Sequence, residues 1–227
     1  MAGPLNPFSG KASAILRVLL VNYPKSWALR GLAAEADVSL GWASKVSEAL
    51  IRERLAIRDS ERAELRLIAP EDLLRRWASF TNFEAHNGFI QYHSAEPDLA
   101  KFVSSFKGLN GPDYALTGLA GTLLAAPLVK PSNTHIYVKS EGDAKAWAHL
   151  LGLSPVEENG NVKFAVAADK STFYGSHIID GVRVVSDIQL FVDLLNYPHR
   201  GREAAEEVFK VIGKRWQNNN HDRRDTE

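Results

Sequence analysis

The stretch Asp37–Leu50, DVSLGWASKVSEAL, decides how the first part of this chain folds. Its first residues are typical of a turn, and Ser39 is a suitable N-cap, so we expect a helix to begin there. Ala43, Val46 and Leu50 follow at intervals of three and four residues, which places them on one face of that helix. The pattern therefore predicts a buried aliphatic face and an exposed face of short polar and cationic side chains.

Two shorter helical patterns precede this stretch, and a strand pattern follows it. Apolar residues at helical spacing predict one helix over Ala12–Leu20, which Pro24 ends, and another from about Leu29 to Ala36. Over Leu55–Ile68 apolar and polar residues alternate around a polar segment, which is typical of a two-stranded hairpin. Three helices and a hairpin form the plan of a winged helix-turn-helix, which we predict for residues 1–70.

A winged helix-turn-helix binds DNA by placing its second helix in the major groove, where residues near the helix N-terminus reach the bases. Cations on the hairpin can contact the phosphate backbone. The residues that we predict to bind DNA are Ser39, Gly41, Trp42, Ser44, Lys45, Arg58, Arg62 and Arg66. For Trp42 two positions stay open, against the DNA or packed into the protein. A winged helix can also serve as a protein-binding or structural module, and that alternative stays open as well.

The charge distribution agrees with a basic first domain in an otherwise balanced chain. The 227 residues carry 27 Lys and Arg and 27 Asp and Glu, a formal net charge of zero. Residues 1–70 hold ten basic and seven acidic residues, a net charge of +3, which leaves −3 for the remainder. This asymmetry is modest, so the prediction of DNA binding depends on the local pattern rather than on net charge.

Strand and helix patterns alternate in the rest of the chain. Residues 71–112 are expected to form linking helices and a connector. Residues 113–217 contain strand patterns such as Tyr114–Leu116 and His135–Lys139 with helical patterns between them, which predicts a mixed α/β domain. The whole chain is therefore expected to be an α+β protein. The polar residues 218–227 are expected to form a disordered tail.

Composition excludes several classes of protein. The sequence has no cysteine, which rules out disulfides and thiolate metal sites and favours a cytoplasmic protein. The longest uncharged stretch, Tyr114–Val129, contains two glycines and a proline, and it is shorter than the roughly 20 apolar residues of a membrane span. We therefore expect neither a signal peptide nor contact with a membrane.

No catalytic, metal or cofactor site is predicted. The seven histidines form no His-x-x-x-His pair and no dense cluster with carboxylates, so we expect them on the surface or in the core. Arg200 and Arg202 flank a glycine and form a candidate functional surface, because such a loop can hold a phosphate. The start of a helix, with Glu203 in its first turn, explains the same loop.

Two resemblances follow from these motifs. The stretch Leu29–Val46 is similar to the helix-turn-helix of many bacterial winged-helix regulators. The second half of the chain resembles the second domain of the AbiEi-type antitoxins. The segments that carry this second resemblance are Tyr114–Gly121, Pro127, His135–Val138, Val185–Leu194 and Arg200–Glu206. Together the two resemblances span most of the chain.

The resemblance implies a bacterial type IV toxin-antitoxin system. In that family an N-terminal winged helix represses the operon by binding its own promoter, which is double-stranded DNA. The C-terminal domain counters a nucleotidyltransferase-like toxin without necessarily binding it. Arg54 is a departure, because it stands where such winged helices often carry a glycine before the wing. The sequence does not indicate an oligomeric state.

Two further interpretations remain beside the antitoxin. One is a ligand- or partner-sensing winged-helix regulator outside any toxin-antitoxin system. The other is a catalytically inactive nucleotidyltransferase-like protein. Active nucleotidyltransferases need carboxylates on one strand to hold divalent metal ions. The matching strand here, His135–Lys139, has no carboxylate, so we expect no enzymatic activity.

Overall fold

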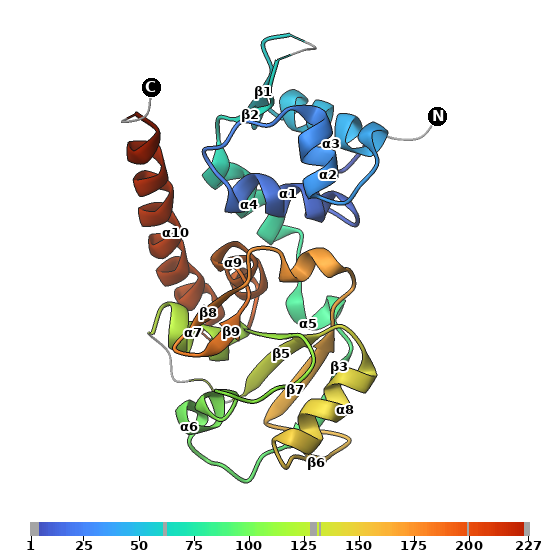
Figure 1. Cartoon of the computed structure of the whole chain (residues 1–227), viewed down its shortest axis with the longest axis vertical. Coiled ribbons are helices and arrows are strands. Elements are labelled where there is room, and N and C mark those ends of the chain that lie inside the picture. Colours follow the sequence, from blue (N-terminus) through green and yellow to red (C-terminus); the bar gives the residue numbers. More distant parts are fainter. Residues whose placement is uncertain (1–4, 61–62, 128–130, 132, 199, 225–227) are drawn as a thin grey trace. The chain divides into compact units, whose positions relative to one another are not determined.

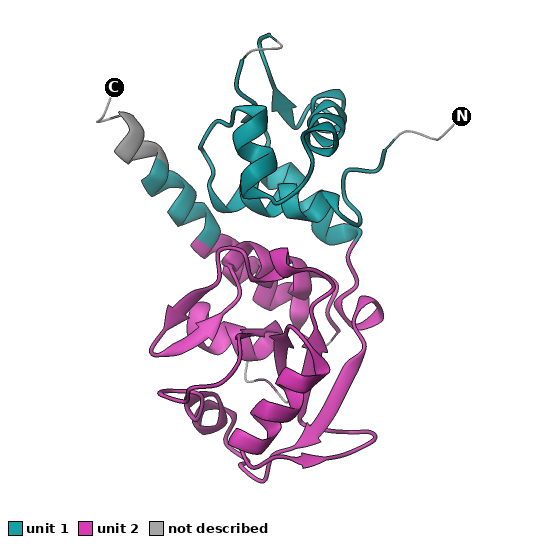
Figure 2. Ribbon diagram, turned by 45° about the vertical axis from the view of Figure 1, so that its right-hand side comes forward, with its two compact units in different colours: residues 1–80, 212–227 teal, residues 81–211 magenta. Residues whose placement is uncertain are grey.

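The structure is a computed structural model (Figure 1) that describes residues 5–60, 63–127, 131, 133–198 and 200–224, with side chains as far as residue 219. The chain forms two compact units, drawn in teal and magenta in Figure 2. Unit 1 comprises residues 1–80 and 212–227, and unit 2 comprises residues 81–211. Both helices and strands are present, which confirms the predicted mixed fold class.

Three helices begin unit 1, as predicted. They are α1 (Ala12–Val21), α2 (Leu29–Glu35) and α3 (Leu40–Arg52). Ser39 is the N-cap of α3, because its Oγ accepts a hydrogen bond of 3.2 Å from the backbone N–H of Trp42. This bond satisfies one of the N–H groups that the first turn of a helix leaves unpaired.

The aliphatic face of α3 forms part of the core of unit 1. Ala43, Val46 and Leu50 have no exposed surface, as their spacing predicted. The helix contacts α1, α2 and β1 (Ala56–Ile57). Because burial of one Val or Leu side chain contributes about 1.5–3 kcal/mol, this face fixes the rotation of α3 about its own axis.

A hairpin follows α3 and is connected to the segment before α2. Strand β1 pairs antiparallel with β2 (Arg66–Leu67). Trp27 and Leu65 form a further antiparallel bridge, in which each backbone N–H donates to the other residue's carbonyl oxygen at 2.9 and 2.8 Å. A bridge of single residues leaves no alternating pattern in the sequence, so this third strand position was not predicted.

The end of the chain also belongs to unit 1. The last helix, α10 (Gly201–Arg224), begins in unit 2 and ends in unit 1. In unit 1 the buried Trp216 donates its Nε1–H to the carbonyl oxygen of Leu20 at 3.1 Å. Asn219 donates its Nδ2–H to the carbonyl oxygen of Tyr23 at 3.1 Å. These bonds connect α10 to the end of α1.

The boundaries of the two units differ from the expected ones in two places. Helix α4 (Pro70–Ser79) belongs to unit 1, so the expected connector, residues 71–112, is divided between the units. Of the expected disordered tail, residues 218–227, the part up to Arg224 is helical. Both differences arise from contacts between segments far apart in the chain, which a local pattern of residues does not encode.

Arg54 forms the turn after α3 in the left-handed region, with φ 58°. Its N–H donates to the carbonyl oxygen of Ile51, and the N–H of Leu55 donates to that of Leu50, both at 2.9 Å. This is the hydrogen-bond pattern of a Schellman motif, which glycine usually completes. The hairpin therefore follows α3 through the usual turn geometry, and the Cβ of Arg54 costs about 1 kcal/mol of strain.

Unit 2 is built on a sheet that has, among the described residues, seven strands in the order β6-β3-β7-β5-β4-β9-β8. The strands are β3 (Phe89–His93), β4 (Tyr114–Thr117), β5 (Thr134–Val138), β6 (Ser154–Pro155), β7 (Val162–Val166), β8 (His177–Ile179) and β9 (Val182–Val184). The pairs β4–β9 and β5–β7 are parallel, and the other neighbours are antiparallel. All five residues of the central strand β5 are buried.

Helices cover this sheet and complete the core of unit 2 (Figure 1). They are α5 (Phe83–His86), α6 (Leu99–Ser104), α7 (Gly118–Ala125), α8 (Glu141–Leu150) and α9 (Asp187–Leu195), with a 3-10 turn at Lys170–Phe173. Helix α8 contacts β3, β5 and β7, whereas α7 contacts β4, β5, β9 and α9. The β4–α7–β5 order agrees with the two strand patterns and the intervening helical pattern that the sequence predicted.

A buried carboxylate holds α9 against the sheet. Asp193 accepts hydrogen bonds from Thr117 Oγ1 at 2.6 Å, Tyr137 Oη at 3.2 Å and Gln189 Nε2 at 2.7 Å. The four residues come from β4, β5 and α9, and all are buried. Because a buried polar group left without a partner costs about 1–3 kcal/mol, this cluster favours one position of α9 on the sheet.

Replacing Arg54 with glycine is expected to stabilise unit 1. Glycine adopts a φ of 58° without the steric cost of a Cβ, so the free energy of unfolding should rise by about 1 kcal/mol. Chemical denaturation followed by circular dichroism measures this change. The matched control is Arg52→Gly, inside the last turn of α3, which should lower stability by about 1 kcal/mol. A loss of stability for Arg54→Gly would contradict the left-handed turn.

Candidate functional site

The flank of α3 opposite its buried face carries the predicted DNA-binding residues. Ser39, Gly41 and Lys45 are exposed, and Ser44 is half-buried. The first turn of the helix has no acidic residue. Because a helix N-terminus carries a partial positive charge and free backbone N–H groups, this end of α3 suits a phosphate or another anion.

Lys45 and Ser44 differ in what they already contact. Among the residues that the structure describes, Lys45 forms no ion pair, so its ammonium group is free to meet a phosphate or a base. The hydroxyl of Ser44 donates a hydrogen bond of 2.9 Å to Glu48 Oε1, one turn further along α3. Ser44 therefore has to exchange this bond before its hydroxyl can donate to a nucleic acid.

Trp42 lies partly inside the protein. The residue is half-buried, and its Nε1 atom is covered without a hydrogen-bond partner among the described residues. The sequence left two positions open for Trp42, against the DNA or packed into the protein. The covered part of the indole is packed into the protein. The exposed remainder offers an apolar surface beside Gly41 and Lys45.

The hairpin supplies two of the three predicted cations. Arg66, on β2 opposite Ile57, is exposed, and Arg58 is half-buried. Neither forms an ion pair within the described ranges of the chain. Arg62 lies outside the described residues. Arg58 and Arg66 are therefore the predicted hairpin cations whose exposure the structure describes.

Two residues of this surface were missed by sequence reasoning. Leu40, the first residue of α3, is 45% exposed although it is large and apolar. Arg30 is exposed on α2 and has no ion pair in the described part of the chain. The signal for Arg30 was present, since α2 buries Leu32 and Ala33 and its other side must face solvent. An exposed apolar side chain at this position suits a thymine methyl group.

The candidate surface at Arg200 and Arg202 is largely occupied within the chain. Arg200 donates from Nε and Nη2 to the two carboxylate oxygens of Glu203, each at 2.6 Å. These hydrogen bonds lower the pKa of the Glu203 carboxyl. A helix start with a paired first turn therefore explains Arg200, whereas Arg202 is exposed and has no ion pair among the described residues.

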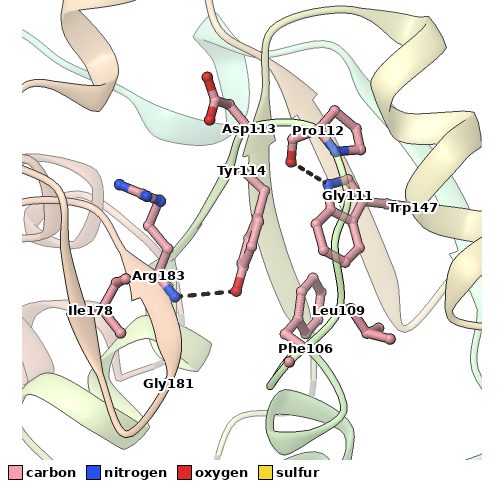
Figure 3. A pocket seen from close by; sticks show the side chains of 11 residues that line it. Phe106, Leu109, Gly111, Pro112, Asp113, Tyr114, Trp147, Ile178, Gly181 and Arg183 are labelled. Atoms are coloured by element: carbon pink, nitrogen blue, oxygen red, sulfur yellow. Dashed lines mark hydrogen bonds between the residues drawn. The ribbon is translucent and has the colours of Figure 1, made fainter.

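Unit 2 contains a small hollow between the β8–β9 hairpin and the segment before β4 (Figure 3). Its volume is about 200 Å³. Phe106, Tyr114 and Trp147 lie along one side, with Ile178 and Arg183 along the other. Pockets for drug-sized ligands usually measure about 300–1,000 Å³, so this hollow is small for a nucleotide or a large cofactor.

Comparison with known proteins identifies the family. A family model described as "Transcriptional regulator, AbiEi antitoxin, Type IV TA system" matches residues 66–212. The chain belongs to the AbiEi antitoxin family. This confirms the resemblance found in the second half of the sequence. Members of the AbiEi family are described as transcriptional regulators and antitoxins of type IV systems. No curated protein and no solved structure matches the chain.

The match to the AbiEi family begins at β2 and covers unit 2, so α1, α2 and α3 lie before it. Unit 2 is thus the part of this chain that carries the family's sequence pattern. Within the described ranges, no helix combines the length and the apolar character that crossing a membrane requires. Within the same ranges, no group of three or more His, Asp or Glu residues is arranged to hold a metal ion.

His135 on β5 is a core residue of this AbiEi-family chain. It is fully buried, and neither ring nitrogen has a hydrogen-bond partner among the described residues. Its ring makes edge contacts with Phe83, Phe89 and Tyr197 at centroid distances of 5.2 to 5.5 Å. Burial, with a smaller contribution from the charge of Lys163, lowers the pKa of His135 to about 3. The side chain is therefore neutral and packs as an aromatic ring.

This histidine should make stability depend on pH. In the unfolded chain its pKa is 6.5, so between pH 6.5 and about 3 the unfolded state binds a proton that the folded state excludes. The contribution of His135 is fully present above pH 6.5 and falls by about 1.4 kcal/mol per pH unit below it. The measurement is the free energy of unfolding of the parent chain and of His135→Phe across this range.

The comparison with His135→Phe isolates the histidine from the other titrating groups. The difference in stability between the two chains should be constant above pH 6.5 and should shift by about 2 kcal/mol in favour of phenylalanine by pH 5. A difference that does not change with pH would mean that the imidazole is solvated or hydrogen-bonded in the folded protein.

Proposed function

We propose that this chain is a DNA-binding repressor of its own operon, and that unit 1 is a winged helix-turn-helix. The observation that carries the proposal is the solvent-facing flank at the start of α3: the first turn has no acidic residue, and Lys45 in the second turn is exposed without an ion pair among the described residues. Arg58 and Arg66 add cations on the hairpin that follows. This combination suits a negatively charged duplex.

The order of elements in unit 1 supports the winged helix. Three helices are followed by the β1–β2 hairpin, and the bridge between Trp27 and Leu65 adds a short strand between α1 and α2. The Schellman turn at Arg54 leads from α3 into the first strand of the hairpin. In a winged helix the same order presents the third helix and the wing to the same ligand.

The surface of α3 suggests separate roles for its residues. Ser39 and the free N–H groups of the first turn suit a phosphate. Gly41 has open space around its Cα, so a groove edge can approach it closely. Leu40 and Lys45 are then the side chains with reach to the bases. Arg30, Arg58 and Arg66 would contact the phosphate backbone of the DNA and fix the position of the protein along the duplex.

We further propose that unit 2 carries the antitoxin role of the family, in a functional link to a nucleotidyltransferase-like toxin. The family match over residues 66–212 supports this assignment, because it covers the whole of unit 2. No catalytic role is proposed for unit 2, since strand β5 and Lys139 after it have no carboxylate with which to hold a divalent metal ion.

Lys45→Ala tests the DNA interface. Loss of one phosphate contact should lower affinity for the promoter DNA of the chain's own operon by about tenfold, since a hydrogen bond to a charged group contributes about 1.5 kcal/mol. The slope of log K against log salt concentration should become shallower by about 0.9. Fluorescence anisotropy of a labelled promoter fragment at several salt concentrations measures both quantities.

The matched control for this experiment is Lys145→Ala, which removes an exposed lysine from α8 in unit 2. It should leave affinity and slope unchanged. Equal slopes for Lys45→Ala and the parent chain, or an equal loss with Lys145→Ala, would contradict the interface. Failure of the parent chain to bind its promoter would leave unit 1 as a protein-binding module.

Co-expression tests the antitoxin role separately. The chain, expressed with the product of the neighbouring gene, should restore growth that this product alone arrests. The chain with Lys45→Ala should still restore growth from a separate promoter, because the proposed role of unit 2 does not need DNA binding. Persistent toxicity with the parent chain present, or a harmless neighbour, would falsify the antitoxin assignment.

A further inference from the structure

The sheet of unit 2 has one protected edge and one open edge. At the open edge, β8 pairs with β9 on one side and with no other strand among the described residues. Its central residue, Ile178, is 63% exposed, more than any other large hydrophobic side chain that the structure describes. At the other edge, β6 has two residues, and its Pro155 has no N–H to donate. Edge strands are commonly protected by proline or by charged residues, and β8 has neither.

The backbone of Ile178 points toward the open edge. Asp180 and Gly181 form the two-residue turn between β8 and β9, with φ 49° and 83°. In a hairpin with a two-residue turn, the two residues that flank the turn, here Ile179 and Val182, form backbone hydrogen bonds with each other. The next two facing residues, Ile178 and Arg183, form none with each other. The N–H of Arg183 donates instead to Tyr114 Oη at 3.2 Å (Figure 3). The N–H and C=O of Ile178 therefore point away from β9.

Two opposite charges at this edge have no ion pair within the described part of the chain. Arg183 lies across from Ile178 on the same face of the sheet, and its Nη1–H donates a hydrogen bond of 3.4 Å to Ser176 Oγ. The hydrogen bond from Lys139 lowers the pKa of the Asp113 carboxyl, and the charge of Arg183 also contributes to lowering it. Asp180 is exposed in the turn. The edge thus offers a guanidinium without an ion pair among the described residues, an exposed carboxylate and an exposed apolar side chain within a few residues of each other.

We propose that β8 pairs antiparallel with β8 of a second copy of this chain, about a twofold axis at Ile178. In this register the two Ile178 residues face each other, with Cα atoms about 5.5 Å apart. Ser176 faces Asp180 of the second copy. Arg183, which already reaches Ser176, then meets that carboxylate, and the symmetry forms the same pair twice.

This complementarity favours a second copy over another partner. A twofold interface requires a surface that is complementary to itself. Here Ile178 lies on the axis, and on each side of it Arg183 of one copy meets Asp180 of the other. Since β8 has three residues, we expect a dimer with a micromolar dissociation constant rather than an obligate one. The pairing does not depend on the proposed binding of DNA, and it can be tested without DNA.

The first test is sedimentation equilibrium of the full chain over a range of concentrations. The parent chain should dimerise reversibly. Ile178→Lys should weaken the dimer at least tenfold, because it places two cations opposite each other on the axis. Ser154→Lys, at the protected edge, should have no effect. A monomeric parent chain at every concentration, or a dimer that Ile178→Lys does not weaken, would overturn the proposal.

The second test examines the charge pair. Arg183→Gln and Asp180→Asn should each weaken the dimer about tenfold, and the double variant should weaken it no further, because both remove the same pair. Asparagine tolerates the positive φ of position 180, so the turn is kept. Independent, additive losses would show that the two residues do not meet across the axis.

The third test uses the absence of cysteine from the sequence. A single Ile178→Cys variant can form a disulfide only with a second copy, and the expected separation of the two Cα atoms, about 5.5 Å, lies in the range that disulfides span. Mild oxidation should convert it to a covalent dimer much faster than Ser154→Cys at the other edge. Equal rates for the two variants would mean random collision and would overturn the proposed register.

Discussion

Burial of the aliphatic face of α3 determines what unit 1 can present to a partner. Ala43, Val46 and Leu50 are fully buried, so the helix cannot rotate without exposing them to water. That constraint alone turns Lys45 outward, and the Ser39 cap fixes where the helix begins. The direction of the helix, its start and its exposed flank thus follow from one packed face and one hydrogen bond.

Unit 2 is organised by polar contacts inside a mostly apolar core. The carboxylate of Asp193 connects α9 to β4 and β5, while the neutral ring of His135 fills an aromatic cluster on the same central strand. Neither group needs a ligand to explain its position. The segments that carry the resemblance to the AbiEi family, such as Tyr114–Gly121 and Val185–Leu194, include residues that hold the sheet and its helices together.

Spacing predicted which side chains of α3 are exposed, but it did not predict which contacts those side chains already make. Spacing alone placed Gly41 and Lys45 outside. It could not indicate that Ser44 donates to Glu48, because that bond depends on the rotamers of both residues. Nor could it decide how deeply Trp42 packs, since an indole can cover apolar surface and still keep one edge in water.

Periodicity, capping and short motifs are local properties, and from them the sequence predicted the first three helices of unit 1, the mixed character of unit 2 and the resemblance to the family. The tertiary structure alone decided that Trp27 pairs with Leu65, that the end of α10 packs on α1, and that β8 lies at the edge of the sheet. Trp216 and Leu20 are separated by 196 positions. Contacts across such distances depend on how complete surfaces fit together, and no short stretch of residues records that fit.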